Sequence, residues 1–154
     1  MSQTPDLSTP EAVHRYFSVY CFNHTWDLLD KVDRTAEEDE AMLQTCLASL
    51  WHWNQRPDCT DKNKSVGAWQ AARVYAVLKQ PENARRYAQM ALDFSIGQPP
   101  FYQAYAYEAL ARAEASAGNR AKAEWCIEKS SELAELVEKA DDRKLILDDL
   151  KTIL

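Results

Sequence analysis

Apolar residues along this chain recur every three or four positions, and short polar stretches with proline or glycine separate most of these runs. Such spacing places apolar side chains on one face of an α-helix, whereas a half-buried strand would alternate apolar and polar residues. The chain has only three glycines and no β-branched alternating run. The pattern therefore predicts an all-α protein of about seven helices without a sheet. The expected helices cover about residues 10–31, 36–55, 66–79, 81–95, 101–117, 120–139 and 141–153.

Residues with capping chemistry mark the expected helix starts. Thr9 is followed by Pro10, an arrangement typical of a helix N-terminus. Thr35 and Glu38 have the spacing of a capping box, in which each residue satisfies a backbone N–H near the other. The remaining caps are predicted at Ser65, before the third helix, and at Asp141, before the last one.

Two amphipathic faces are predicted to be buried. In the first helix, the face consists of Val13, Phe17, Tyr20, His24 and Leu28, widened by Tyr16, Cys21 and Leu29. In the last helix, the apolar residues are Leu145, Leu147, Leu150, Ile153 and Leu154. We expect this last helix to cover the open end of the fold.

The length of 154 residues suits a single domain. Residues 1–8 are expected to form a flexible polar arm, and residues 9–154 the domain. Residues 56–65 lack periodicity and are predicted to be a mobile loop. The domain would consist of hairpins 10–55, 66–96 and 101–139, followed by the capping helix 141–153.

The formal net charge of −6 disfavours partners rich in phosphate, because binding to nucleic acid or to an anionic membrane uses clustered Lys and Arg. The N-terminus has neither the basic start nor the apolar core of a secretory signal. No uncharged apolar run is long enough to span a bilayer. We therefore expect a cytoplasmic protein.

Two segments, residues 68–92 and 107–133, share a layout with a period of about 39 residues. The chain resembles tetratricopeptide (TPR) repeats in these segments, although Glu114 replaces a usual tyrosine and Ser130 a usual alanine. Short fragments, His24–Leu29 and Arg73–Leu78, are similar to those of a group of short bacterial TPR-like proteins. The matching positions are Ala72, Tyr75, Ala84, Ala91 and Leu92 in the first segment, and Tyr107, Leu110, Ala111, Gly118 and Ala123 in the second.

The resemblance implies a right-handed superhelix of antiparallel hairpins whose concave groove binds a protein or peptide. The family's groove positions fall on Trp69, Gln70, Arg73 and Val77, and on Tyr105, Glu108, Arg112 and Ser116. Two arginines beside one glutamate suggest a local positive excess, and hence an acidic or C-terminal carboxylate ligand. Alternatively, Arg73, Glu108 and Arg112 form an ion network with a purely structural role.

A second class of function, a small-molecule or metal-dependent enzyme within a helical bundle, has weaker support. The weak metal candidates are His14, His24 and His52, and an antiparallel hairpin would pair His52 with His14 rather than with His24. No HxxxH, HExxH or CxxC pattern accompanies them, so neither a metal nor another cofactor is expected. Cys59 is the only thiol whose surroundings, with two lysines nearby, would lower its pKa.

Overall fold

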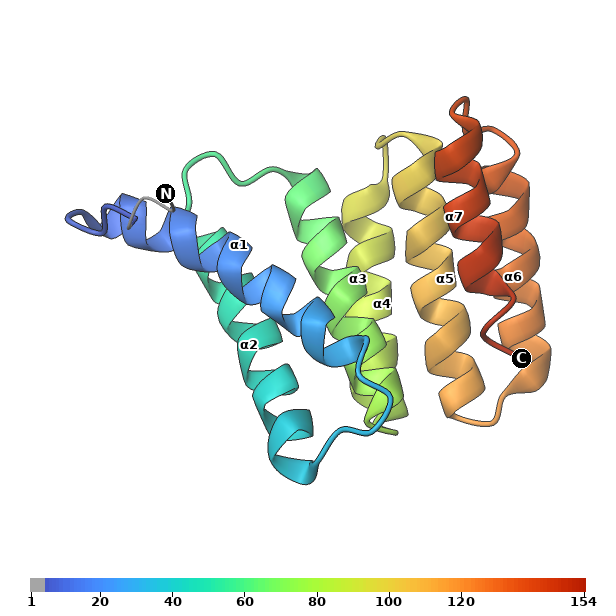
Figure 1. Ribbon diagram of the computed structural model, residues 1–154. Coiled ribbons are helices and arrows are strands. Elements are labelled where there is room, and N and C mark those ends of the chain that lie inside the picture. Colours follow the sequence, from blue (N-terminus) through green and yellow to red (C-terminus); the bar gives the residue numbers. More distant parts are fainter. Residues whose placement is uncertain (1–4) are drawn as a thin grey trace.

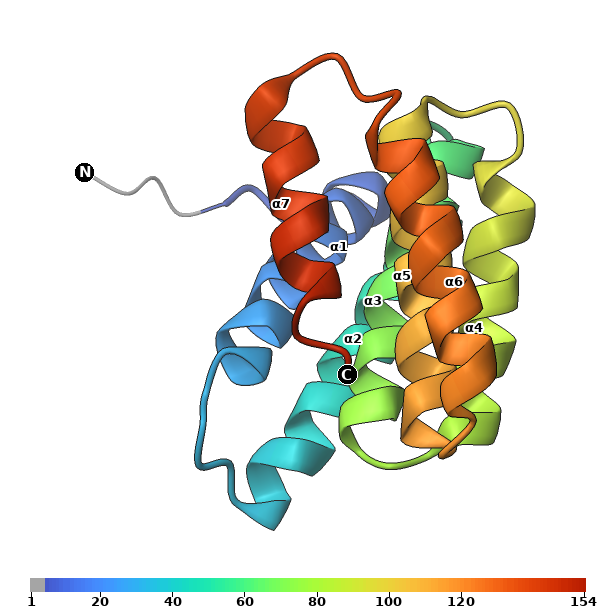
Figure 2. The ribbon, with the colours of Figure 1, turned by 90° about the vertical axis from the view of Figure 1, so that its right-hand side faces the viewer.

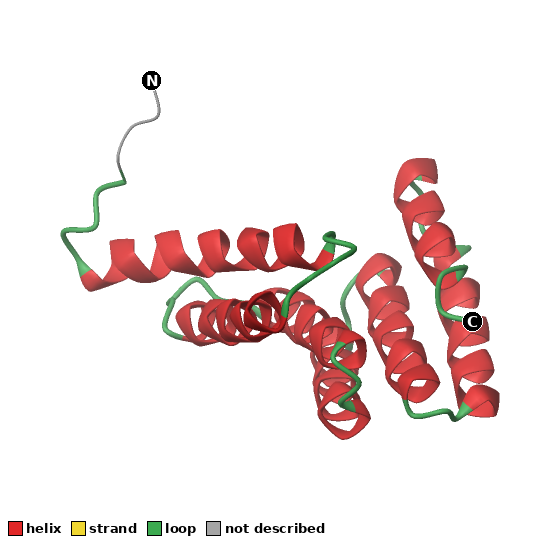
Figure 3. Ribbon diagram, turned by 60° about the horizontal axis from the view of Figure 1, so that its bottom comes forward, coloured by secondary structure: helices red, strands yellow, loops and turns green. Residues whose placement is uncertain are grey.

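The computed structural model describes residues 5–154, which form seven helices and no strand in that range. The helices are joined by loops without further regular structure (Figure 3). The all-α prediction is confirmed. Residues 1–4 of the expected N-terminal arm lie outside the described residues. The helices are α1 (Pro10–Leu29), α2 (Ala36–Asn54), α3 (Asp61–Val77), α4 (Pro81–Ser95), α5 (Pro100–Ser116), α6 (Arg120–Ala134) and α7 (Ala140–Leu150).

Consecutive helices pack as hairpins, α1 with α2, α3 with α4, and α5 with α6, and the hairpins stack side by side (Figure 1). The helices α1 and α7 lie on one side of α3 and α5, and α4 and α6 lie on the other side (Figure 2). One face of α3 and α5 is therefore flanked by α1 and α7, which is where the candidate site lies.

The predicted caps of the first two helices are confirmed. The Thr9 side chain accepts a hydrogen bond from the N–H of Ala12. Thr35 and Glu38 form the capping box, with both reciprocal hydrogen bonds present. These bonds satisfy N–H groups that a helix N-terminus otherwise leaves without a partner.

The predicted start of the third helix is wrong by about one turn. The helix begins at Asp61, because Thr60 and Asn63 form a second capping box. Ser65 is buried within the helix, and its hydroxyl donates to the carbonyl of Ala91 on α4 at 2.9 Å. The loop expected over residues 56–65 is correspondingly shorter.

The predicted end of α6 and start of α7 also need correction. The helix α6 stops at Ala134, and Lys139 rather than Asp141 is the residue that precedes α7. Within α7 the buried residues are Ile146 and Leu150. Leu145 is 56% exposed, so the buried face is rotated from the predicted one, although the helix packs on α5 and α6 as expected. Leu154, also expected to be buried, is 52% exposed.

The buried face of α1 differs from the predicted aromatic stripe, since Tyr20 is 49% exposed. Small side chains let α2 approach closely, and backbone carbonyls satisfy the buried hydroxyls. Thr25 donates to the carbonyl of Cys21 at 2.8 Å, and Ser49 of α2 donates to that of Ser18 at 2.7 Å. The residues buried on α1 are Ser18, Cys21, Thr25 and Leu28.

Alanines fill much of the space between the later helices, as the repeated pattern predicts. Ala72, Ala88 and Ala109 are fully buried in one cluster. The rings of Tyr75 and Tyr87 stack with centroids 5.4 Å apart and occupy the wider gaps. This alternation of small and large residues allows close packing of the α3–α4 and α5–α6 hairpins.

The first hairpin attaches to the second asymmetrically. The helix α2 packs closely on α3 at Gly67, where an added Cβ would lie 2.7 Å from Cδ2 of Leu50. By contrast, α1 runs obliquely and approaches α3 only with its C-terminal half (Figure 1). There Trp26 and Trp69 have ring centroids 5.2 Å apart, and the Gln70 amide donates to the carbonyl of Phe22 at 2.9 Å. A wedge therefore opens between α1 and the N-terminal half of α3.

Candidate functional site

The predicted groove residues form two neighbouring columns, one on α3 and one on α5. The rings of Trp69 and Tyr105 lie across the helix boundary with centroids 4.8 Å apart. The Trp69 indole N–H donates to the Glu108 carboxylate at 2.8 Å. The side-by-side placement of the two columns is therefore as expected.

Glu108 is the centre of this face. Its side chain is completely buried, yet it lies next to two guanidinium groups. Arg112 donates directly to its carboxylate, and Arg73 lies 3.8 Å from it. Since an unpaired carboxylate is very costly to bury, these partners explain how the charge is accommodated there.

The predicted positive excess around the two arginines is wrong, because α7 contributes Asp149. This carboxylate lies 3.6 Å from Arg73 and accepts a hydrogen bond from the Tyr105 hydroxyl at 2.9 Å. Arg112 also donates to the backbone carbonyl of Asp149 at 3.0 Å and to the Thr152 hydroxyl at 2.7 Å. Two arginines thus face two carboxylates, and burial together with the Asp149 charge raises the pKa of Tyr105.

The other predicted groove residues do not form part of the open face beside Trp69 and Tyr105. Gln70 is 1% exposed, and its amide is engaged with α1, so it does not line an open surface. Val77 and Ser116 line a separate hollow of about 220 Å³ at the far end of α3 and α5, together with Arg112. Thr152, after α7, forms part of the wall of this hollow.

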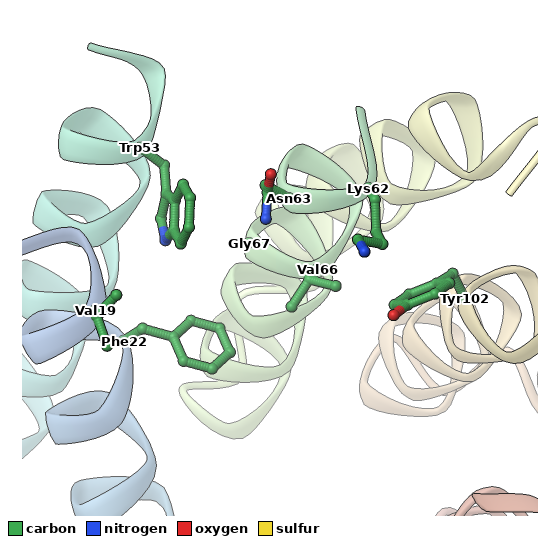
Figure 4. A pocket seen from close by; sticks show the side chains of 8 residues that line it. All are labelled: Val19, Phe22, Trp53, Lys62, Asn63, Val66, Gly67 and Tyr102. Atoms are coloured by element: carbon green, nitrogen blue, oxygen red, sulfur yellow. The ribbon is translucent and has the colours of Figure 1, made fainter. Parts of the chain in front are cut away.

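The open part of the face lies in the wedge beside α1. A hollow of about 260 Å³ there is lined by side chains from α1, α2, α3 and α5. Phe22 and Trp53 line one side, and Val66 and Tyr102 line the other (Figure 4). The complete lining is Val19, Phe22, Trp53, Lys62, Asn63, Val66, Gly67 and Tyr102.

Two further hollows adjoin this one at the N-terminal end of α5. The first, of about 150 Å³, shares Val66 and Tyr102 with it and is also lined by Trp69, Phe101 and Tyr105. The second, of about 780 Å³, shares Phe101 and Tyr102 and reaches Leu136 in the α6–α7 connection. The first two hollows therefore form a largely apolar groove across α1, α3 and α5, and the third, which is also lined by the charged Glu138, Lys139 and Asp142, continues it to the start of α7.

Sequence reasoning missed most residues of this groove. Val66 and Tyr102 could have been found, because each lies three positions before a predicted residue, Trp69 or Tyr105, on the same helix face. Phe22 and Trp53 carry no such signal, since their position depends on the oblique course of α1. The groove is thus about one helical turn closer to the N-termini of α3 and α5 than predicted.

The chain was also compared with known protein families, curated proteins and solved structures. No match was found. Within residues 5–154, no helix combines the length and the apolar character needed to cross a lipid bilayer. In the same range, no three or more His, Cys, Asp or Glu side chains are grouped so that they could hold a metal ion.

The histidines pair as predicted. The Nδ1 atoms of His14 and His52 lie 2.9 Å apart, whereas His24 lies 3.7 Å from Asp27. Burial, and then the neighbouring His14, lower the pKa of His52. The prediction for Cys59 is wrong, because partial burial raises the pKa of this thiol more than nearby cationic side chains lower it. Its thiol is therefore not activated as a nucleophile.

Proposed function

We propose that this protein is a non-enzymatic, TPR-like binding scaffold whose groove takes a peptide or an extended segment of a partner protein. The observation that carries the proposal is the continuous apolar groove across α1, α3 and α5. Phe101, Tyr102 and Tyr105 contribute large, stiff surfaces to it. Aromatic rings of this kind give contact area at a low cost in side-chain entropy, which suits the recognition of a partner segment.

The proposed ligand carries an acidic side chain or a C-terminal carboxylate. Arg73 and Arg112 are already engaged by Glu108 and Asp149, so a carboxylate from outside would have to compete with Asp149 for them. Lys62, at the rim of the groove, makes no ion pair with any residue between 5 and 154. We therefore place the acidic group of the ligand near Lys62.

The proposed place of action is the cytoplasm. The buried thiols of Cys21, Cys46 and Cys126 are free, as is the partly buried one of Cys59. Free thiols suit a reducing compartment, where they are not driven to form disulfides.

Site-specific photo-cross-linking tests the scaffold directly. The photoreactive residue p-benzoylphenylalanine replaces Tyr102 in the groove. In the control protein it replaces Trp125 on α6, because Trp125 is 48% exposed and lines none of the hollows described above. Each protein is irradiated in an extract of the source cells. We expect a discrete adduct from position 102 and none from position 125.

A blocking substitution identifies adducts that depend on the groove. Val66→Arg places a charged chain in the apolar hollow and should abolish the adduct, because burying an unpaired charge is unfavourable. Ile96→Arg is the matched control, since Ile96 is 78% exposed on the α4–α5 connection. Identical adducts from both cross-linking positions, or an adduct that survives Val66→Arg in a protein with unchanged melting, would contradict the scaffold.

A further inference from the structure

We infer that the wedge between α1 and α3 is a socket for one bulky aromatic side chain that has a carboxylate next to it in the partner. This inference rests on the proposed function and specifies the ligand chemistry of the same groove. The lining of the socket, the donors at its rim and its volume each support it.

The volume fits a side chain better than a whole small molecule. Pockets for drug-sized ligands have volumes of about 300–1,000 Å³. The socket, of about 260 Å³, lies below this range, and it shares Val66 and Tyr102 with the adjoining hollow of about 150 Å³. It therefore accommodates one large ring, and the adjoining hollow accommodates a smaller apolar group of the same segment.

The walls of the socket favour an aromatic ring over an aliphatic group. Three of the eight lining residues are aromatic, with Phe22 and Trp53 on one side of Val66 and Tyr102 on the other, so an inserted ring lies among aromatic side chains (Figure 4). Offset and edge-to-face contacts between rings contribute about 0.5–1.5 kcal/mol beyond simple burial. An aliphatic side chain of similar size would lack this contribution.

The rim of the socket offers hydrogen-bond donors and a positive charge. The Asn63 side-chain oxygen accepts from the N–H and the hydroxyl of Thr60 in the capping box, which fixes the amide orientation and leaves its NH₂ group available as a donor. The Lys62 ammonium lies 5.8 Å from the centroid of the Tyr102 ring, on the socket side (Figure 4). Two donors of this kind match a carboxylate and would repel a cation.

The neighbouring charges are arranged so that Lys62 stays available. Asp61, the nearest acid in sequence, lies 3.5 Å from Lys64, and Lys64 in turn lies over the Phe94 ring of α4. Asp58 is held by Arg56, with the two side chains 2.8 Å apart. The acids closest in sequence thus have other partners, and Lys62 is left to meet the ligand.

Titration with two small probes tests the socket. N-acetyltryptophan has an indole ring with a carboxylate, and N-acetyltryptophan amide has the same ring without the charge. Binding is followed by ¹⁵N–¹H NMR at the backbone amides of Val66, Gly67 and Tyr102. We expect saturable shifts confined to the socket, a Kd on the order of 1 mM for N-acetyltryptophan, and about three- to fivefold weaker binding of the amide.

Matched variants assign the contacts. Lys62→Gln should remove the preference for the carboxylate while the ring still binds, whereas Lys64→Gln, next to Asp61, should preserve the preference. Val66→Trp fills the hollow and should abolish binding of both probes. The inference is overturned if no saturable shift occurs at the socket amides, or if the preference persists in Lys62→Gln.

The two proposals can fail separately. If a partner is cross-linked from position 102 but neither probe binds, the socket inference is contradicted and the scaffold proposal stands. If the probes bind as expected but no groove-dependent adduct forms, the scaffold proposal is contradicted and the socket inference stands.

Discussion

The guanidinium of Arg73 on α3 lies 3.6 Å from the carboxylate of Asp149 on α7. The Tyr105 hydroxyl of α5 donates to the same carboxylate at 2.9 Å. One acidic side chain near the end of the chain therefore joins three helices and balances the charge of the groove centre. We expect this contact to stabilise the protein.

Asp149→Asn should lower the free energy of unfolding by about 1–3 kcal/mol, because Arg73 loses a charged partner in a partly buried site. Urea denaturation measures the change. Asp148→Asn is the matched control, since Asp148 pairs with the exposed Lys144 and Lys151, and it should have little effect. Equal losses for the two variants would show that the contact with Arg73 has no special role.

Glu114→Gln should destabilise the protein by about 2 kcal/mol. The Glu114 side chain is 1% exposed and lies 2.9 Å from Arg85 of α4 and 3.2 Å from Lys122 of α6, so it connects three helices. The control Glu124→Gln removes an exposed pair with Arg120 and should cost less than about 0.5 kcal/mol. A similar loss in both variants would contradict the connecting role.

The same residue makes the stability depend on pH. Hydrogen bonds from Arg85, and then from Lys122, lower the pKa of Glu114 from its ordinary value of 4.5. The folded state therefore binds the proton less readily than the unfolded state, so this contribution is present above pH 4.5 and is lost as the pH falls through the lowered pKa. Thermal melts in acid should show a smaller pH-dependent loss for Glu114→Gln than for the wild type.

The helix starts could be predicted where the sequence contains a familiar cap. Thr9 with Pro10, and Thr35 with Glu38, gave the correct starts. The start of α3 was missed, because its capping box uses Asn63 in place of the commoner glutamate or glutamine. Local capping chemistry therefore determined the starts of these helices. The start of α3 was predicted wrongly because Asn63 is a less common residue at the capping-box position.

Only part of the candidate site could be predicted from the sequence. Helical spacing puts each column on one face of its helix, whereas the meeting of Trp69 with Tyr105 was expected from the resemblance to TPR repeats, whose successive first helices lie side by side. The position of Asp149 depends on how α7 folds back over α5, which no local pattern gives. The buried face of α1 was wrong for a related reason, since close packing by α2 favoured Ser18 and Thr25 over larger aromatic residues.

The histidine pair should make the first hairpin sensitive to pH. His52 has a lowered pKa in the folded state, so the folded protein binds fewer protons than the unfolded one near the ordinary value of 6.5. Stability should therefore fall as the pH drops below 6.5 and through the lowered pKa. Protonation of both rings would also leave no acceptor for the bond between His14 and His52.

Urea midpoints at about pH 7.5 and about pH 5.5 measure this effect. The difference between the midpoints should shrink in His52→Gln and in His14→Gln. In His24→Gln it should persist, because His24 contacts Asp27 and not the pair. An unchanged difference in all three variants would rule out the pair as its source.

Thiol titration should find one reactive cysteine in the folded protein. Cys59 is partly exposed, and its raised pKa should make it react with Ellman's reagent more slowly than free cysteine. Burial raises the pKa of Cys46 to about 12 and that of Cys126 to about 11, and Cys21 is also buried. The folded Cys59→Ser variant should therefore not react with Ellman's reagent on this timescale, and denaturation should expose the remaining thiols. Rapid reaction of a second thiol in the native wild type would contradict the described packing.

Gln70 determines the shape of the socket before any ligand arrives. Its buried amide donates to the Phe22 carbonyl and so holds α1 at a fixed distance from α3. The contact between Leu50 and Gly67 likewise keeps α2 against α3. The hollow between them does not have to open when a ring enters, so the protein loses little conformational freedom on binding and most of the entropic cost falls on the ligand.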